Sequence, residues 1–152
     1  MKADIPQHKV MDLAIAVIPR KDEKEEMWDT YLINLKEEAI KSVLISSKGY
    51  GKLNGEEMKT TTLRHFFEEI GPKQVVQIEP IQTILFDLTN EYWVSFVQNE
   101  YMYDKKYVFV IGSIVSSNFT KIPLLERNGV MIKLHRYRLI YSSIPYPKIA
   151  IA

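Results

Sequence analysis

Residues 74–116 constrain the fold of this chain more than any other stretch. They hold four short apolar runs rich in β-branched and aromatic residues, and clusters of turn-forming residues separate these runs. Short runs of this composition, bounded by turn residues, are typical of strands. The stretch therefore predicts a meander of antiparallel strands that supplies most of the core.

Further strands are predicted on both sides of the meander. Apolar and polar residues alternate in the segments that precede it, and Pro19 ends the first of them. The link at residues 36–38 is too short for a crossover, so its flanking strands are expected to form an antiparallel hairpin. The predicted strands are residues 9–18, 28–35, 39–47, 75–79, 83–88, 92–98, 107–115 and 130–141.

One helix is predicted, with its core at residues 63–70. Four apolar residues recur there at helical spacing and would form one stripe that lies on the sheet. A threonine of residues 60–62 can cap the helix, because its hydroxyl accepts from a first-turn amide, and Gly71-Pro72 ends it. The stripe consists of Leu63, Phe66, Phe67 and Ile70.

These elements predict the α+β class. We expect a mainly antiparallel, twisted sheet of about seven strands, a meander or half-barrel, with one amphipathic helix near residues 60–70 on a face. The chain has 152 residues, of which 46% are hydrophobic, which is enough for one core. We expect residues 1–141 to form a single domain. Residues 142–152 contain two prolines and no clear period, so we expect a loosely ordered tail.

The absence of cysteine excludes disulfides, thiolate metal sites and thiol nucleophiles. The first apolar run is short, is interrupted by Asp12 and lacks a small-residue cleavage site, so no signal peptide is expected. No window approaches the ~20 apolar residues that a membrane helix needs. We therefore expect a soluble, cytoplasmic protein with no membrane partner.

The chain contains no catalytic signature, but two groups of side chains are candidates for acid–base chemistry. His65 precedes Glu68 and Glu69 by three and four residues, a spacing that places an imidazole beside a carboxylate on a helix. Exposed helix pairs commonly have the same spacing. Asp87 and Glu91 flank a turn, where acids serve either catalysis or ordinary turn chemistry.

A metal site is not expected. Metal binding needs three or four converging ligands. His8, His65 and His135 are far apart and form no metal-binding spacing. We therefore expect neither a metal nor another cofactor.

A glycine-rich loop and an aromatic hairpin tip are candidates for ligand contact. The loop at residues 48–55 carries three glycines, but their spacing matches neither the dinucleotide fingerprint nor the P-loop. The tip at residues 99–106 carries tyrosines that suit a protein or small-ligand contact, or are ordinary surface residues. The residues proposed for ligand binding are Tyr50, Lys52, His65, Tyr101 and Tyr103.

The C-terminal part of the chain is basic. Residues 129–152 carry four basic residues and no acid. A nucleic-acid surface combines cations and stacking rings on one face. In the predicted strand 130–141 the cations alternate between two faces, which favours a solvated strand. The alternative nucleic-acid site consists of Lys133, Arg136 and Arg138.

The chain resembles a family of small bacterial proteins, sometimes labelled phenylalanyl-tRNA synthetase-like, in four segments: GYGK at 49–52, TLRHFFEEI at 62–70, NEYWVSF at 90–96 and YDKKYVFV at 103–110. The resemblance covers about residues 9–116. The label implies aminoacylation or tRNA contact. The chain is too short for a synthetase catalytic domain and lacks that class's arginine-bearing motifs, so no functional residue is carried over.

The function that best fits these features is a non-catalytic cytosolic binding or interaction domain, whose partner is an unidentified protein or small molecule. The sequence leaves open whether two copies of the chain form a homodimer by pairing through a sheet edge. The alternative is an RNA-binding or tRNA-binding accessory domain that uses the glycine loop and the basic strand. The third is an enzyme in which His65, Glu68, Glu69 or Asp87 converge in a pocket.

Overall fold

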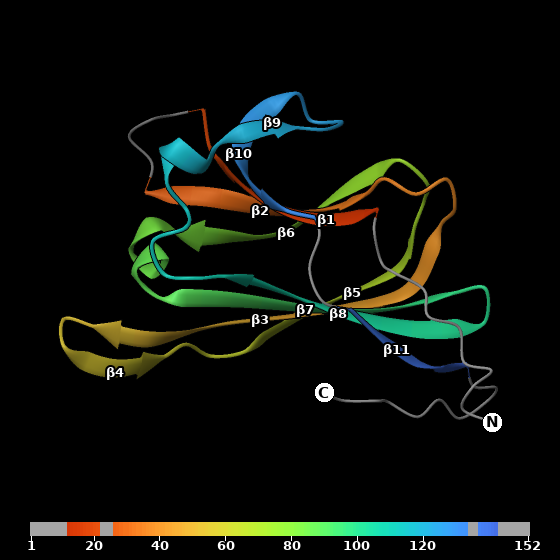
Figure 1. Ribbon diagram of the computed structural model, residues 1–152, viewed down its shortest axis with the longest axis horizontal. Coiled ribbons are helices and arrows are strands. Elements are labelled where there is room, and N and C mark those ends of the chain that lie inside the picture. Colours follow the sequence, from red (N-terminus) through yellow and green to blue (C-terminus); the bar gives the residue numbers. More distant parts are fainter. Residues whose placement is uncertain (1–11, 22–25, 134–136, 143–152) are drawn as a thin grey trace.

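The computed structural model describes residues 12–21, 26–133 and 137–142. In this part of the chain, strands form a five-stranded and a six-stranded antiparallel sheet that lie over one another as two layers (Figure 1). The first sheet has the order β6-β2-β1-β10-β9 and the second the order β11-β8-β7-β3-β4, with β5 also paired to β3. The strands are β1 (Leu13–Pro19), β2 (Met27–Asn34), β3 (Ile40–Leu53), β4 (Glu56–Lys59), β5 (Leu63–Ile70), β6 (Gln74–Gln82), β7 (Thr89–Gln98), β8 (Tyr101–Phe109), β9 (Thr120–Ile122), β10 (Arg127–Ile132) and β11 (Tyr137–Ser142).

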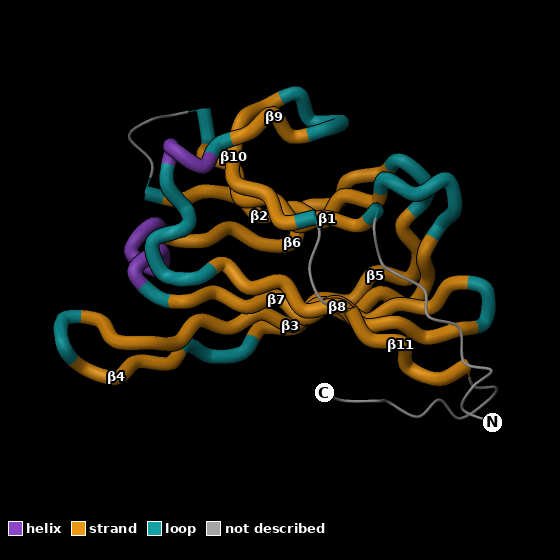
Figure 2. The backbone as a smooth tube through the Cα atoms, viewed as in Figure 1, coloured by secondary structure: helices purple, strands orange, loops and turns teal. Residues whose placement is uncertain are grey.

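The α+β prediction is wrong, because the described residues contain no α-helix. Figure 2 shows helical backbone only in two short segments of that part, the 3₁₀ helices η2 (Thr83–Asp87) and η3 (Ser116–Asn118). The structure there has no helix that is long and apolar enough to span a membrane. Two facing sheets take the place of the single sheet and helix that were expected.

The predicted helix at 63–70 is strand β5, which pairs antiparallel with β3. The apolar stripe was ambiguous, because adjacent Phe66 and Phe67 satisfy helical spacing and yet lie on opposite faces of a strand. Phe67 packs against the core between the sheets, whereas Phe66 is 63% exposed. The β3 backbone supplies hydrogen-bond partners along the whole segment, and this tertiary pairing overrides a local helical pattern.

The predicted hairpin between residues 28–35 and 39–47 is also wrong, because β2 belongs to the first sheet and β3 to the second. The chain crosses between the layers at this point. The fully buried Asn34 side chain fixes the crossing: its amide donates to the carbonyls of Glu38 (3.1 Å) and Gly71 (2.8 Å), and its oxygen accepts from the Lys36 amide (3.0 Å). Gly71 lies in the second crossing, from β5 to β6, so one side chain joins both.

Other element boundaries also differ from the sequence predictions. Residues 83–88 form η2 rather than a strand, and the glycine loop continues β3 into a hairpin with β4. The strand expected at 107–115 ends at Phe109 in β8, and residues 130–141 divide into β10 and β11 of different sheets. The strands predicted at 28–35 and 92–98 are confirmed as β2 and β7. The tail at 143–152 and the beginning of the 9–18 strand lie outside the described residues.

The core lies between the two sheets. β1 contributes one face to it through Leu13, Ile15 and Val17, and β7 contributes Tyr92, Val94 and Phe96 from the other layer. Because strand side chains alternate, the opposite face of β1 carries Ala14, Ala16 and Ile18, which are buried in a second cluster with Ile33 and Ile122. β1 is therefore buried on both faces and anchors the first sheet.

Candidate functional site

A pocket of about 310 Å³ opens where an edge of each sheet lies on the same side of the molecule. β6 is an edge strand of the first sheet, and β5 borders the second sheet beside it. β5 begins at Leu63, so residues 60–61 and the inward-facing residues Ser47 and Gly49 of β3 lie opposite the end of β6 without a strand between them. The pocket occupies the gap along β3 between the end of β4 at Lys59 and the beginning of β5 at Leu63.

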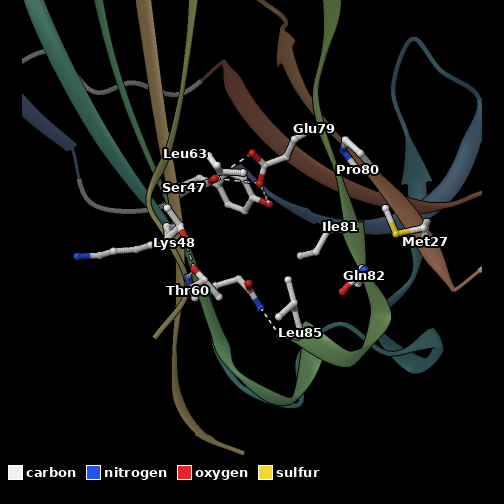
Figure 3. A pocket seen from close by; sticks show the side chains of 14 residues that line it. Met27, Ser47, Lys48, Thr60, Leu63, Glu79, Pro80, Ile81, Gln82 and Leu85 are labelled. Atoms are coloured by element: carbon white, nitrogen blue, oxygen red, sulfur yellow. Dashed lines mark hydrogen bonds between the residues drawn. The ribbon is translucent and has the colours of Figure 1, made fainter. Parts of the chain in front are cut away.

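The pocket has apolar walls and a polar end (Figure 3). Glu79 and Ser47 lie at one end of the view, and Thr60 and Leu85 lie at the other. The Lys48 side chain points away from the pocket, and its ammonium lies 4.0 Å from Glu91. The apolar lining comes from Met27, Leu63, Pro80, Ile81 and Leu85.

Glu79 is the hub of the polar end. Its carboxylate accepts hydrogen bonds from the Ser47 hydroxyl (2.9 Å to each oxygen) and from the Tyr92 hydroxyl (3.2 Å). The His65 Nε2 atom lies 2.7 Å from Glu79 Oε1. Glu79 comes from the first sheet and the other three residues from the second, so this cluster also ties the two layers together.

A β-bulge turns the Glu79 side chain toward the space between the two sheets. Thr30 of β2 pairs with Glu79 and Tyr31 pairs with Gln77, so β6 has one extra residue, Ile78, at this point. An extra residue breaks the alternation of side chains along a strand. Ile78 and Glu79 therefore both point toward the second sheet. The Thr30 hydroxyl donates to the Glu79 carbonyl (2.8 Å) and accepts from the Glu79 amide (3.2 Å), which holds the bulge.

The cluster does not have the order of a nucleophilic triad. In a triad the imidazole lies between the hydroxyl and the carboxylate. Here Ser47 and His65 each contact the Glu79 carboxylate, which lies between them. Burial and the charge of Glu79 raise the pKa of Tyr92 well above its ordinary value, so this hydroxyl stays protonated and donates. The geometry suits a fixed acceptor group rather than an activated serine.

A second polar cluster lies on the outer face of the second sheet. Glu91 is 6% exposed and accepts a hydrogen bond from the Tyr50 hydroxyl (3.1 Å), with the Lys106 ammonium 3.6 Å away. The same ammonium lies 5.4 Å from the centre of the Trp93 ring, whose Nε1–H donates to Asp104 (2.9 Å). Burial and the hydrogen bond to Glu91 raise the pKa of Tyr50.

The five predicted ligand-binding residues do not converge. Tyr50 joins the outer cluster, and Lys52 lies in the β3–β4 hairpin opposite Glu57. Tyr103 is 8% exposed and stacks on Phe96 with ring centres 5.3 Å apart, and Tyr101 packs against the core. His65 contacts the pocket's carboxylate, so it alone of the five belongs to this site.

The basic residues proposed for nucleic-acid binding are divided between the sheets. Lys133 follows β10, and its ammonium lies 4.0 Å from Asp12. Arg138 lies on β11, where its backbone partner is Asp104. Arg136 lies outside the described residues. The single basic strand that the sequence predicted is therefore absent from the described part of the chain.

The acids expected near His65 are not its partners. In a strand, Glu68 and Glu69 lie farther along β5, and Asp87 ends η2. The acid expected to pair with Asp87, Glu91, instead accepts a hydrogen bond from Tyr50 on the outer face of the second sheet. The described residues contain no cluster of three histidine, aspartate or glutamate side chains able to hold a metal ion. Sequence analysis missed Glu79, Ser47, Tyr92 and Asn90. The one signal concerned Glu79: an acid followed by proline in a strand whose other polar residues are all glutamines.

Comparison of the chain with protein-family models, with curated proteins and with solved structures finds no match in any of the three.

Proposed function

We propose that this protein is a non-catalytic binding domain and that the pocket between β6 and the β3–β5 side of the second sheet receives a small molecule. One observation carries the proposal: apolar walls lead to a carboxylate that is only 10% exposed and that three side chains hold in place. Small-molecule sites have volumes of about 300–1,000 Å³ and combine apolar lining with a few placed polar groups. At about 310 Å³, this pocket suits a compact ligand.

The arrangement of the polar groups supports binding over catalysis. An activated nucleophile needs a base within hydrogen-bond reach of its proton, with a third group to orient the base. The Ser47 proton is directed to the Glu79 carboxylate, which is a weaker base than an imidazole, and His65 contacts this carboxylate instead of the serine. The RNA-binding alternative has less support, because Lys133 and Arg138 belong to different sheets.

A fragment screen followed by ¹H–¹⁵N NMR tests the proposal. We expect fragments to shift the amide signals of Ser47, Gly49 and Thr60. Thr61 is an exposed residue of the pocket lining, and Thr61→Trp should block entry and lower fragment affinity at least about tenfold. Thr120→Trp, at an exposed threonine of β9, is the matched control and should leave affinity unchanged.

Two results would overturn the proposal. Fragments that bind elsewhere, or that bind Thr61→Trp as tightly as the wild type, would show that the pocket is not the binding site. Turnover of a substrate by the wild type in a broad activity screen, lost in His65→Ala, would overturn its non-catalytic part.

A further inference from the structure

We infer that the pocket selects an organic ammonium compound, a protonated amine on a compact apolar body. This inference rests on the proposed function and names its ligand class. The reason is a balance of hydrogen-bonding groups: the buried side chains of the pocket have spare acceptors but no spare donors.

The donors of the buried lining residues Ser47, Tyr92 and Asn90 are all in use, whereas Thr61 and Gln82 of the lining are exposed. The Ser47 and Tyr92 hydroxyls donate to Glu79, and the Thr60 hydroxyl donates to the Thr61 carbonyl (3.0 Å). The Asn90 amide donates to the carbonyls of Leu85 (2.7 Å) and Leu88 (3.2 Å). A ligand rich in acceptors, such as a carboxylate, finds no buried side-chain donor here.

Acceptors remain in two places. An ionised carboxylate has about four acceptor positions, and three donors reach Glu79, which leaves about one. Asn90 is 5% exposed and lines the pocket, and its side-chain oxygen accepts no hydrogen bond from a described residue. A buried polar atom without a partner is costly, so a ligand that donates to it gains free energy on binding.

The charge of the pocket favours a cation. Glu79 is the one acidic residue of the lining, and His65, which contacts its carboxylate, lies outside the lining. Lys48 lines the pocket, but its ammonium points outward toward Glu91. Charge-assisted hydrogen bonds are roughly twice as strong as neutral ones. An ammonium group at Glu79 therefore binds better than a hydroxyl, with the apolar body against Ile81 and Leu85.

Three probes of the same shape test this inference: phenethylamine, phenethyl alcohol and phenylacetate, titrated at neutral pH and followed by ¹H–¹⁵N NMR. We expect phenethylamine to bind about tenfold more tightly than the alcohol, because its ammonium makes a charged hydrogen bond, and phenylacetate to bind most weakly. Glu79→Gln should abolish the preference for the amine. Glu91→Gln removes a buried charge on the outer face and should keep the preference.

The outcomes separate this inference from the proposed function. Equal or tighter binding of the alcohol or of phenylacetate in the pocket would overturn the ammonium class and leave the binding domain standing. A preference for the amine that survives in Glu79→Gln would also overturn it. Absence of pocket shifts with all three probes and with every fragment of the screen would overturn both. If Glu79→Gln does not fold, the comparison of probes on the wild type decides.

Discussion

Single buried polar residues determine much of this geometry. Asn34 joins two of the crossings between the sheets, β2 to β3 and β5 to β6, and Glu79 joins β6 to three strands of the opposite layer. The Tyr107 hydroxyl, on the second sheet, donates to the carbonyl of Leu13 on the first (2.7 Å). Buried polar groups require partners, so each of these residues specifies one relative position of the sheets, which apolar contacts alone do not.

A buried lysine makes stability depend on pH. Lys105 is 1% exposed, and burial, followed by the charges of Lys36 and Lys133, lowers its pKa from 10.5 to about 8. Between these values the unfolded chain binds more protons than the folded chain, so the free energy of unfolding rises with pH in this window. We expect a rise of about 2 kcal/mol between pH 7.5 and 9.5, measured by urea denaturation.

The control for this prediction is Lys105→Met, which should lack most of the rise. The measurement stops below pH 10 because burial raises the pKa of Tyr92 and Tyr107, so the unfolded tyrosines lose protons first and stability then falls. Equal pH slopes in the wild type and in Lys105→Met would show that the lysine is not the cause.

At the scale of elements, close strand packing depends on Gly129 of β10. A Cβ atom at this position would lie 2.5 Å from the Val17 carbonyl oxygen and 2.9 Å from Ile18 Cγ1, both of β1. Gly129→Ala would therefore push β10 away from the buried strand with which it pairs. We expect a loss of about 3 kcal/mol in the free energy of unfolding, measured by chemical denaturation.

Gly71→Ala is the matched control for Gly129→Ala. The nearest atom to its new Cβ is Gln74 Oε1 at 3.1 Å, the end of an exposed, flexible side chain. Gly71→Ala should lower the free energy of unfolding by less than about 1 kcal/mol. Similar losses in both variants would contradict the steric explanation.

The sequence predicted individual strands better than their partners. β2 and β7 carry alternating apolar residues and were located correctly. The assignment of β2 and β3 to different sheets depends on Asn34 and on a segment more than thirty residues away, near Gly71. β5 was mistaken for a helix because Phe66-Phe67 fits both periods, and only pairing with β3 distinguishes them.

The candidate site was less predictable than the strands. His65 was singled out, but with the wrong partners, because a helix was assumed. Its actual partner, Glu79, points inward through a bulge at Ile78, and one residue more or less in β6 reverses the faces. A bulge of this kind has no reliable signal in a single sequence, so the cluster could not be assembled before the structure.

At the scale of the whole molecule, the two sheets share one core. The main buried cluster contains residues of β1, β2 and β6 from the first sheet together with residues of β3, β7 and β8 from the second. Removing either layer would expose the inner face of the other. We therefore expect the sheets to unfold together, as a single cooperative unit.

The two tryptophans test this expectation, because each reports on one sheet. Trp28 of β2 packs edge-on against Phe86 and Phe119, with ring centres 4.9 Å and 5.8 Å away, and Trp93 lies on β7. In Trp93→Phe, the fluorescence of the remaining Trp28 reports on the first sheet. In Trp28→Phe, the fluorescence of the remaining Trp93 reports on the second sheet. We expect fluorescence and far-UV circular dichroism to give one midpoint within each variant, since a shared core cannot be lost from one side alone. A Trp28 transition at lower denaturant than the loss of circular dichroism would mean that the first sheet detaches while the second persists, and the single-domain prediction would then be wrong.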